Sequence, residues 1–265
     1  MSTSAGDRAV VRVGFQRNTP PFSYAHAPTA EFDPVGYSVD LARLVLAKVF
    51  GGAHAMPPLE AVEVTSSTRE RLLAEGRIDI ECGSTTITQE RRLRSAFSRP
   101  IFRTSHRIAV KPGAFEVAGG PRIVGIQGST SQAALKSRTD LEFPYTFVGV
   151  DSIGAARDAF LGDPGTGAMV ADEVILRSLL RGGAAHEGIT LLDIRLGGEF
   201  YGFMMRRDDR ELVRAVDAAL DEVLASDAYP ALLTSWFVDE LPGLGFGLDM
   251  DLADDTFVDR NRQDR

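Results

Sequence analysis

The sequence predicts an α/β protein made of two similar lobes, in which helices cover mostly parallel sheets. Three observations lead to this fold class. Apolar segments of strand length alternate with segments that have helical periodicity. The alternation pauses at KPG (111–113) and then begins again in the same order. The composition, with 44% hydrophobic and 25% charged residues in a chain of 265, is that of one large or two small globular domains.

The first lobe is predicted from strands and helices that alternate up to residue 110. The first strand ends at NTPPFS, because proline cannot donate to a β-ladder. Ser38 is of the type that N-caps a helix, and Gly76 of the type that ends one. The predicted elements are the strand VVRVGF (10–15), the helix SVDLARLVLAKVF (38–50), the strand EAVEV (60–64), the helix SSTRERLLAEG (66–76), the strand RIDIE (77–81) and the strand IFRTSHRIAV (101–110).

The second lobe is predicted from a similar series, after which the chain returns to the first lobe. The segment 207–237 is helical, and its apolar stripe predicts that it packs on the first lobe. The other elements are the strand RIVGI (122–126), the helix GSTSQAALKS (128–137), the strand TFVGV (146–150), the helix SIGAARDAFLG (152–162), the strand GAMVA (167–171), the helix DEVILRSLLRGG (172–183), and the strands ITLLDI (189–194) and EFYGFMMRR (199–207).

These elements divide the chain into four parts. They are a first segment of lobe 1 (1–110), lobe 2 (111–197), a return segment of lobe 1 (198–238) and an acidic C-terminal tail (239–265). The tail has little hydrophobic periodicity and many acidic residues, which predicts partial disorder.

Charge and cysteine content exclude several classes of function. The net charge is −8 and the pI about 5.1, and no segment is dense in Lys or Arg, so we expect no nucleic-acid partner. Cys82 is the single cysteine, which rules out an internal disulfide. The four histidines are far apart in the chain and match no zinc spacing, and no dinucleotide or phosphate-loop motif occurs. We therefore expect neither a metal site nor a cofactor.

The sequence also bears on localisation. No stretch reaches the roughly 18 apolar residues that span a bilayer, and the start MSTSAGDRAV lacks both the basic residues and the apolar run of a secretory signal. We expect a periplasmic or extracytoplasmic protein whose signal has been removed, with a cytoplasmic location as the alternative.

Two stretches rich in hydroxyl groups follow predicted strands. GSTTITQER (83–91) follows the strand that ends near Ile80, and QGSTSQ (127–132) follows the one that ends near Ile126. Ligands of open α/β sheets bind beyond the carboxyl ends of the strands, where such loops enter helices. Small residues allow close approach of a ligand, and free N–H groups at a helix start favour an anion. The structural alternative is that these hydroxyls only cap helices.

Arg91 and Asp172 add opposite charges to this region. A guanidinium beside a hydroxyl cluster can hold a carboxylate through two charge-assisted bonds, whereas a solvated helical arginine is the alternative. Asp172 ends a predicted strand, where it either caps the next helix or binds an ammonium group. Together across a cleft, these two residues would bind a zwitterion.

The span from Val10 to Phe237 resembles the polar amino-acid branch of the solute-binding proteins of bacterial ABC transporters. Two segments, VTSSTRERLL and ECGSTT, are most similar to the glutamate/aspartate-binding members. The motifs that occur in the order and spacing of the family are VRVGFQRNTPPFSY, VGYSVDLA, EGRIDIECGSTTITQERRLRSAFSRPIF, GIQGSTSQ, AMVADE and FYGFMMRRDDRELVRAVDAAL.

The resemblance implies a periplasmic-binding-protein-like fold of type II, with two hinge strands and the ligand in the cleft between the lobes. The hinges are expected near 109–113 and 196–201. The resemblance further implies a role for each of several residues. Arg91 would bind the α-carboxylate with help from Thr86 and Ser84, and Thr130 with Ser129 beside it would reach the same carboxylate. Asp172 would bind the α-ammonium. Arg69 would either reach a side-chain carboxylate or lie exposed on its helix.

This chain departs from the glutamate/aspartate binders at two places. Gln16 occupies the position of an arginine in the first loop, and Arg17 follows it. Ser152 stands where those relatives carry a histidine. Binders of cationic amino acids tend to have an acid at the position of Gln16, so Lys and Arg are disfavoured as ligands. The ring of Phe22 would either form a wall of the site or pack in the core, and the two alternatives are equal.

We therefore expect a non-enzymatic solute-binding protein, monomeric, that captures glutamate or aspartate, or next glutamine, for an ABC permease in the membrane. One alternative is an enzyme similar to cyclohexadienyl dehydratases, with Asp172 or Glu173 as the acid, although neither is isolated or obviously desolvated. The other alternative is a ligand-sensing domain of a receptor, which would have the same cleft.

Overall fold

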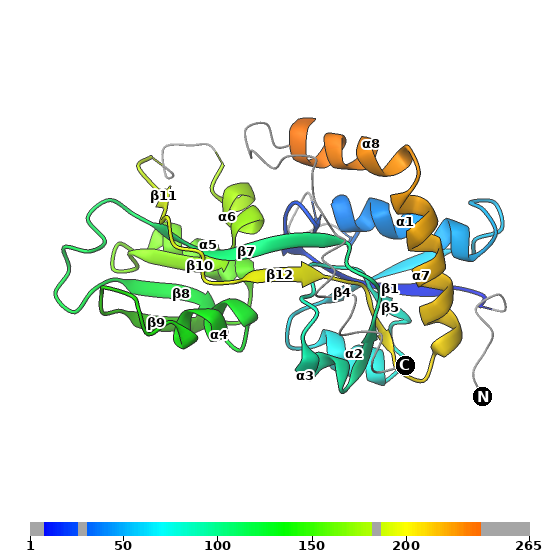
Figure 1. Ribbon diagram of the computed structural model, residues 1–265, viewed down its shortest axis with the longest axis horizontal. Helices are drawn as coiled ribbons and strands as arrows, with labels where there is room; N and C mark the ends of the chain where they lie inside the picture. Colours follow the sequence, from blue (N-terminus) through cyan, green and yellow to red (C-terminus); the bar gives the residue numbers. More distant parts are fainter. Residues whose placement is uncertain (1–7, 26–30, 182–186, 240–265) are drawn as a thin grey trace.

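The protein has two lobes connected by a pair of strands, as a computed structural model shows (Figure 1). The structure describes residues 8–25, 31–181 and 187–239. All but the first residue of the predicted tail (239–265) lies outside this range. In the described part of the chain, no helix has both the length and the apolar character needed to cross a membrane.

The first lobe contains a five-stranded sheet in the order β4-β1-β5-β13-β6. β1 (Val11–Gln16) pairs in parallel with β4 (Leu59–Val64) and β5 (Ile80–Glu81), as the alternation of strands and helices predicts. β13 (Met204–Arg206), which arrives from the return segment, is antiparallel to β5 and to β6 (Ser95–Phe97).

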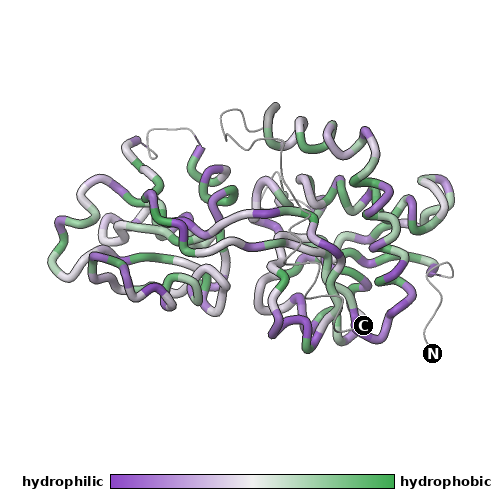
Figure 2. The backbone as a smooth tube through the Cα atoms, viewed as in Figure 1, coloured by the Kyte–Doolittle hydropathy of each residue, from purple (hydrophilic) through white to green (hydrophobic). Residues whose placement is uncertain are grey.

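Helices and one short hairpin complete the first lobe. The helix α7 (Arg210–Leu224) packs on α1 (Tyr37–Val49). Of the stripe Leu212, Val216, Leu220 and Val223/Leu224 that the periodicity predicts, Leu224 is only partly buried and the others are buried. In Figure 2, α7 accordingly alternates between hydrophobic and hydrophilic segments. The remaining elements are α2 (Arg69–Ala74), α3 (Gln89–Arg92), α8 (Ala228–Thr234), the π-helical turn Ser235–Asp239 and the hairpin of β2 (Asn18–Thr19) and β3 (Ser23–Tyr24).

The second lobe has a sheet in the order β11-β7-β10-β8-β9. β8 (Arg122–Ile126) pairs in parallel with β9 (Thr146–Val150) and β10 (Ala168–Asp172). The outer strand β11 (Thr190–Leu191) is shorter than the predicted strand 189–194. The helices α4 (Thr130–Ser137), α5 (Ile153–Gly162) and α6 (Glu173–Leu179) each follow a parallel strand. The carboxyl ends of these strands and the starts of these helices therefore lie at the same edge of the sheet.

Two antiparallel strands connect the lobes. β12 (Gly198–Tyr201) pairs with the first half of β7 (Phe102–Val110), from Phe102 opposite Tyr201 to Ser105 opposite Gly198. The second half of β7 belongs to the sheet of the second lobe, where Ala109 pairs with Met169. The first crossing thus lies before the predicted 109–113, because KPG is a turn within the second lobe and not a boundary between lobes.

Helix α1 begins one residue earlier than predicted. Gly36 occupies the N-cap position with a φ of 139°, and a Cβ there would lie 2.2 Å from the carbonyl oxygen of Phe22. Ser38 lies inside the helix and donates its hydroxyl proton to the carbonyl oxygen of Gly83 at 3.2 Å. The prediction that Ser38 caps the helix is therefore wrong, and its side chain instead ties α1 to the loop GSTTITQER.

Candidate functional site

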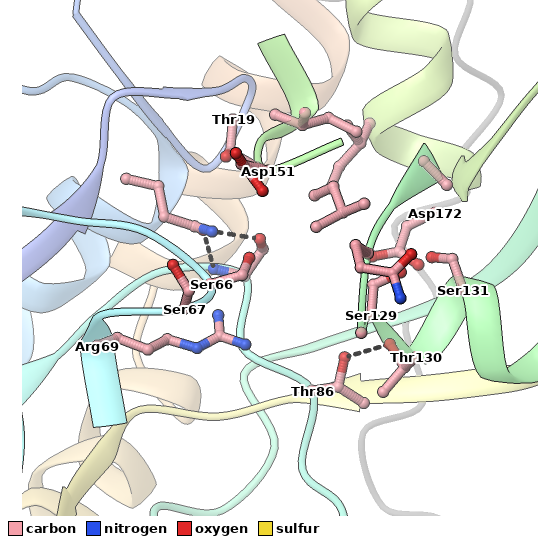
Figure 3. Close-up of a pocket in the computed structure, with 18 of the residues that line it drawn as sticks. Thr19, Ser66, Ser67, Arg69, Thr86, Ser129, Thr130, Ser131, Asp151 and Asp172 are labelled. Carbon is pink, nitrogen blue, oxygen red and sulfur yellow. Dashed lines mark hydrogen bonds between the residues drawn. The ribbon is translucent and has the colours of Figure 1, made fainter. Parts of the chain in front are cut away.

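A cavity of about 300 Å³ lies between the lobes, at the carboxyl ends of the strands of both sheets (Figure 3). Polar side chains dominate its wall. The lining residues are Gln16, Thr19, Ser66, Ser67, Arg69, Ser84, Thr86 and Arg91 from the first lobe, and Ile126, Gln127, Gly128, Ser129, Thr130, Ser131, Asp151, Ile153, Val170, Ala171, Asp172 and Ile175 from the second.

Arg69 is buried in the wall of the cavity, with only 4% of its surface exposed. The alternative of an exposed helical arginine is therefore wrong. Its Nη1 donates to Thr85 Oγ1 at 2.7 Å, and its Nε has no hydrogen-bond partner within the described residues. Thr85 in turn donates to Glu81 Oε2 at 2.6 Å. Burial raises the pKa of Glu81, while the positive charge of Arg69 opposes this shift.

Arg91 lies near Arg69, on the short helix α3. Thr88 caps this helix by accepting a hydrogen bond from the backbone N–H of Arg91 at 3.1 Å. The guanidinium Nη1 of Arg91 donates to the carbonyl oxygen of Thr86 at 2.9 Å, and its Nε lies 3.8 Å from Glu70. Burial and the positive charge of Arg69 lower the pKa of Arg91 to about 10. Two guanidinium groups close enough to repel each other are stabilised by an anion between them.

Ser84 and Gln16 form a second polar group on the first lobe. The Ser84 hydroxyl donates to Gln16 Oε1 at 3.1 Å, and the backbone N–H of Gln16 donates to Ser23 Oγ at 3.0 Å. Arg17, predicted beside Gln16 at the site, does not line the cavity. It pairs with Glu63 at 2.7 Å and lies over the ring of Phe32.

The second lobe contributes the start of α4 to the cavity wall. Ser129 caps this helix by accepting a hydrogen bond from the backbone N–H of Gln132 at 3.1 Å, so it is both a cap and a lining residue. Thr130 reaches across the cleft, where its Oγ1 lies 3.4 Å from Thr86 Oγ1 (Figure 3). The two hydroxyl-rich stretches thus meet between the lobes.

Asp172 lies at the end of β10 and is linked to the connecting strands. Its Oδ1 is 2.5 Å from His106 Nδ1, and Tyr201 donates its hydroxyl proton to Asp172 Oδ2. The side chain of Asp172 makes no hydrogen bond that caps α6. His106 Nε2 is 2.7 Å from Glu199 Oε1, and Thr86 donates to Glu199 Oε2 at 2.7 Å. His106 and Glu199 were not among the predicted residues.

His106, Asp172 and Glu199 offer three atoms within 4.8 Å of one another, close enough to surround a metal ion. Burial lowers the pKa of His106, but hydrogen bonds and the charges of the two carboxylates outweigh it and raise the pKa to about 10. A metal ion requires a deprotonated ring nitrogen. The three side chains form a histidine ion-paired with two carboxylates, and a metal ion would have to displace the ring proton to bind there.

Phe22 and Ser152 both have roles outside the wall of this cavity. Phe22 is fully buried among Tyr37, Phe102 and Tyr201, and the centroid of its ring lies 4.9 Å from the centroid of the Phe102 ring. Phe22 therefore belongs to the core and not to the wall of the site. Ser152 caps α5 by accepting from the backbone N–H of Ala155.

Glu173 lies outside the cavity lining. It pairs with Arg177 at 2.8 Å and accepts a hydrogen bond from Ser105. Of these two acids only Asp172 lines the cavity, and it is already bonded to Tyr201 and paired with His106.

Several lining residues were missed by the sequence analysis. Ser66 and Ser67 were assigned to a helix, but α2 begins only at Arg69, because Thr65 and Thr68 form a hydrogen-bonded turn before it. Asp151 follows the strand β9, and only its position at a strand end could have indicated the site.

Comparisons with known proteins agree with this arrangement. A family model described as bacterial extracellular solute-binding proteins, family 3, matches residues 11–239. An L-glutamate/L-aspartate-binding protein of Pseudomonas aeruginosa is 26% identical over 94% of this chain and 83% of its own length. An ABC transporter glutamine-binding protein of Bacillus subtilis is 22% identical over 88% of this chain and 83% of its own.

Solved structures of the same fold include an ancestral arginine-binding protein bound to arginine, with a TM-score of 0.73 and 25% identity over 87% of this chain and 99% of that one. An ancestral amino acid-binding protein, a precursor of cyclohexadienyl dehydratase, has a TM-score of 0.69 at 24% identity, over 87% of this chain and 96% of that one. Because the family model covers both lobes and both connecting strands, this chain belongs to the bacterial extracellular solute-binding proteins of family 3.

Proposed function

We propose that this protein captures an acidic amino acid, glutamate or aspartate, between its lobes and delivers it to an ABC permease. The observation that carries the proposal is that one cavity is lined by two guanidinium groups from the first lobe, Arg69 and Arg91, and by the carboxylate of Asp172 from the second. An amino acid with an acidic side chain has two carboxylates and one ammonium group, which matches this set of charges.

Each charged group of the ligand has a partner in this proposal. Arg91 binds the α-carboxylate, helped by the hydroxyl proton of Thr130, which turns from Thr86 to the ligand, and Asp172 binds the α-ammonium. Arg69 binds the side-chain carboxylate. Two observations support an anionic ligand: the Nε of Arg69 has no hydrogen-bond partner within the described residues, and burial together with the charge of Arg69 lowers the pKa of Arg91.

The part of the cavity that receives the side chain of the amino acid distinguishes acidic from basic ligands. Arg69 and Asp151 lie at different ends of the cavity (Figure 3). An acidic side chain is attracted to Arg69, whereas the side chain of arginine or lysine would have to turn toward Asp151. The first orientation is favoured because Arg69 is buried and Asp151 is exposed, so solvent screens Asp151 much more strongly.

Binding and closure are coupled in this scheme. A ligand favours the closed state only to the extent that it contacts both lobes at once. Arg91 and Asp172 lie on different lobes, so a bound amino acid would link them. We further propose that the protein acts as a monomer outside the cytoplasm, as delivery to a membrane permease requires.

A thermal-shift screen with the common amino acids tests the proposal. A ligand present at 100 times its dissociation constant adds about 2.7 kcal/mol to the free energy of unfolding. We expect glutamate and aspartate to give the largest shifts, glutamine a smaller one, and arginine and lysine none. Calorimetric titration of the strongest ligands then gives their affinities. Stabilisation by arginine or lysine and not by glutamate would contradict the assignment.

A further inference from the structure

A histidine lies between two carboxylates where the lobes connect. His106 is on the strand β7 and is 2% exposed. Its Nδ1 is 2.5 Å from Asp172 Oδ1, and its Nε2 is 2.7 Å from Glu199 Oε1. Asp172 Oδ1 makes no hydrogen bond within the described residues, so the ring and this carboxylate interact through their charges. The two carboxylates on opposite sides of the ring favour the imidazolium form.

The groups around this imidazolium are mostly acceptors of hydrogen bonds or negatively charged. Ser131 Oγ lies 3.0 Å from His106 Nδ1, Tyr201 donates to the other oxygen of Asp172, and Thr86 donates to the other oxygen of Glu199. Arg91 interacts electrostatically with Glu199, and Arg69 does so with Tyr201. Both carboxylates favour the charged ring, and they raise its pKa to about 10 in spite of the lowering effect of burial.

We propose that His106 is a positioning residue for the ammonium group of the bound amino acid. Its positive charge lies between the carboxylates of Asp172 and Glu199, and its attraction for Asp172 orients this carboxylate at the wall of the cavity. This inference rests on the proposed function, in which Asp172 binds the ammonium group.

The charges explain why a cation is needed at this place. Asp172, Glu199 and His106 together have a charge of −1, which complements one ammonium group. Without the imidazolium, two buried carboxylates this close would share one proton, because like charges raise each other's pKa. A shared proton would then compete with the ammonium group for Asp172.

The position of His106 also connects the ammonium subsite to the two strands that join the lobes. His106 and Glu199 are on the two strands that connect the lobes, and Asp172 is on a strand of the second lobe. The backbone N–H of His106 donates to the carbonyl oxygen of Gly197 at 3.0 Å, which joins β7 to the residue before β12, and the ring lies between Asp172 and Glu199. Asp172 therefore has a defined orientation relative to the first lobe.

The test is calorimetric titration of glutamate into wild type, the variant His106→Gln and the double variant His106→Gln/Glu199→Gln. At pH 7 we expect His106→Gln to weaken binding by about tenfold or more, because Asp172 loses a buried charged partner. We expect the double variant to recover most of this loss, since Asp172 no longer shares a proton with Glu199. His54→Gln, a change at an exposed histidine, is the control and should leave the affinity unchanged.

The pH profile separates positioning from a merely structural role. The wild-type affinity should be constant from about pH 6 to 8.5, because His106 stays protonated over this range. In His106→Gln, binding should strengthen as the pH rises and the shared proton is lost. A weakening that is independent of pH and that Glu199→Gln does not reverse would overturn the inference, and so would wild-type affinity in His106→Gln.

Two further outcomes keep the conclusions separate. A wild type that binds no amino acid contradicts the proposed function, whereas a binding wild type with unaffected His106 variants contradicts only the role of His106. If the variants do not fold, NMR of wild-type protein with ¹⁵N-labelled histidine decides the charge state. We expect both nitrogens of His106 to be protonated at pH 8, and a neutral ring would overturn the inference.

Discussion

Thr86 of the first lobe and Thr130 of the second lobe bring their hydroxyl oxygens within 3.4 Å of each other. The proton of Thr86 is donated to Glu199, so in this pair Thr86 accepts and Thr130 donates. The contact joins the two lobes at the wall of the cavity, which Arg91 and Asp172 also line. In the proposed function, closure of the lobes over a ligand therefore involves both hydroxyl-rich loops.

The first prediction concerns Thr130. Thr130→Val removes the hydroxyl but keeps the shape, and we expect it to weaken amino-acid binding by roughly five- to tenfold, the value of about one hydrogen bond. Thr130→Ser retains the donor and should bind within about twofold of wild type by the same reasoning. Calorimetric titration measures both, and equal losses in the two variants would contradict a role for the hydroxyl.

Arg91→Ala tests the main anchor of the ligand. Removing one partner of a buried charge pair costs about 2 to 5 kcal/mol, which is about 30-fold or more in affinity. We expect no binding to be detectable by calorimetry in a variant whose circular dichroism is that of wild type. Arg94→Ala, on the same loop and with 53% of its side chain exposed, is the matched control and should bind normally. Wild-type affinity in folded Arg91→Ala refutes the assignment.

Arg69→Gln tests the preference for an acidic side chain. We expect glutamate affinity to fall by about tenfold or more, because a buried charge-assisted bond is lost, while glutamine affinity changes much less. Arg71→Ala changes an arginine of the same helix whose side chain is 60% exposed, and it should alter neither affinity. Competition titrations measure the ratio of glutamate affinity to glutamine affinity. If this ratio is the same in Arg69→Gln as in wild type, Arg69 does not contact the side-chain carboxylate.

Phe22→Ala tests the assignment of this ring to the core. Phe22 is fully buried and its ring makes edge contacts with Phe102 and Tyr201, so we expect the free energy of unfolding to fall by about 3 to 5 kcal/mol. Phe115→Ala, at a ring that is 44% exposed, should cost much less. Urea unfolding measures both variants. A small loss for Phe22→Ala together with weaker ligand binding would instead place the ring at the site.

The charge of His106 predicts how stability depends on pH. Its pKa is about 10 in the folded protein and about 6.5 in the unfolded chain, so its ion pairs stabilise the fold fully below pH 6.5. This contribution is lost as the pH rises toward 10, with a slope of at most about 1.4 kcal/mol per pH unit. We expect urea unfolding between pH 6.5 and 9.5 to show that the free energy of unfolding falls more steeply with pH in wild type than in His106→Gln/Glu199→Gln. Parallel pH profiles would contradict the raised pKa.

The local pattern of the chain predicts most of the fold. Strands such as Val11–Gln16 and helices such as Tyr37–Val49 were predicted nearly at their observed bounds, because burial of one face produces a periodicity that is visible in the sequence. The alternation of these elements predicts parallel sheets, and hence a site beyond the strand ends. Arg91, Asp172, Thr86 and Thr130 were predicted there, and all four line the cavity.

Local pattern was insufficient where a residue's role depends on partners far along the chain. The sequence around His106 and Glu199 is that of ordinary strands, and nothing near them indicates that two strands place them against Asp172. For the same reason the sequence does not decide whether Phe22 belongs to the core or to the site. Periodicity reports which face of an element is buried, but ion pairs and pKa shifts depend on distances between side chains, which arise only when the elements pack together.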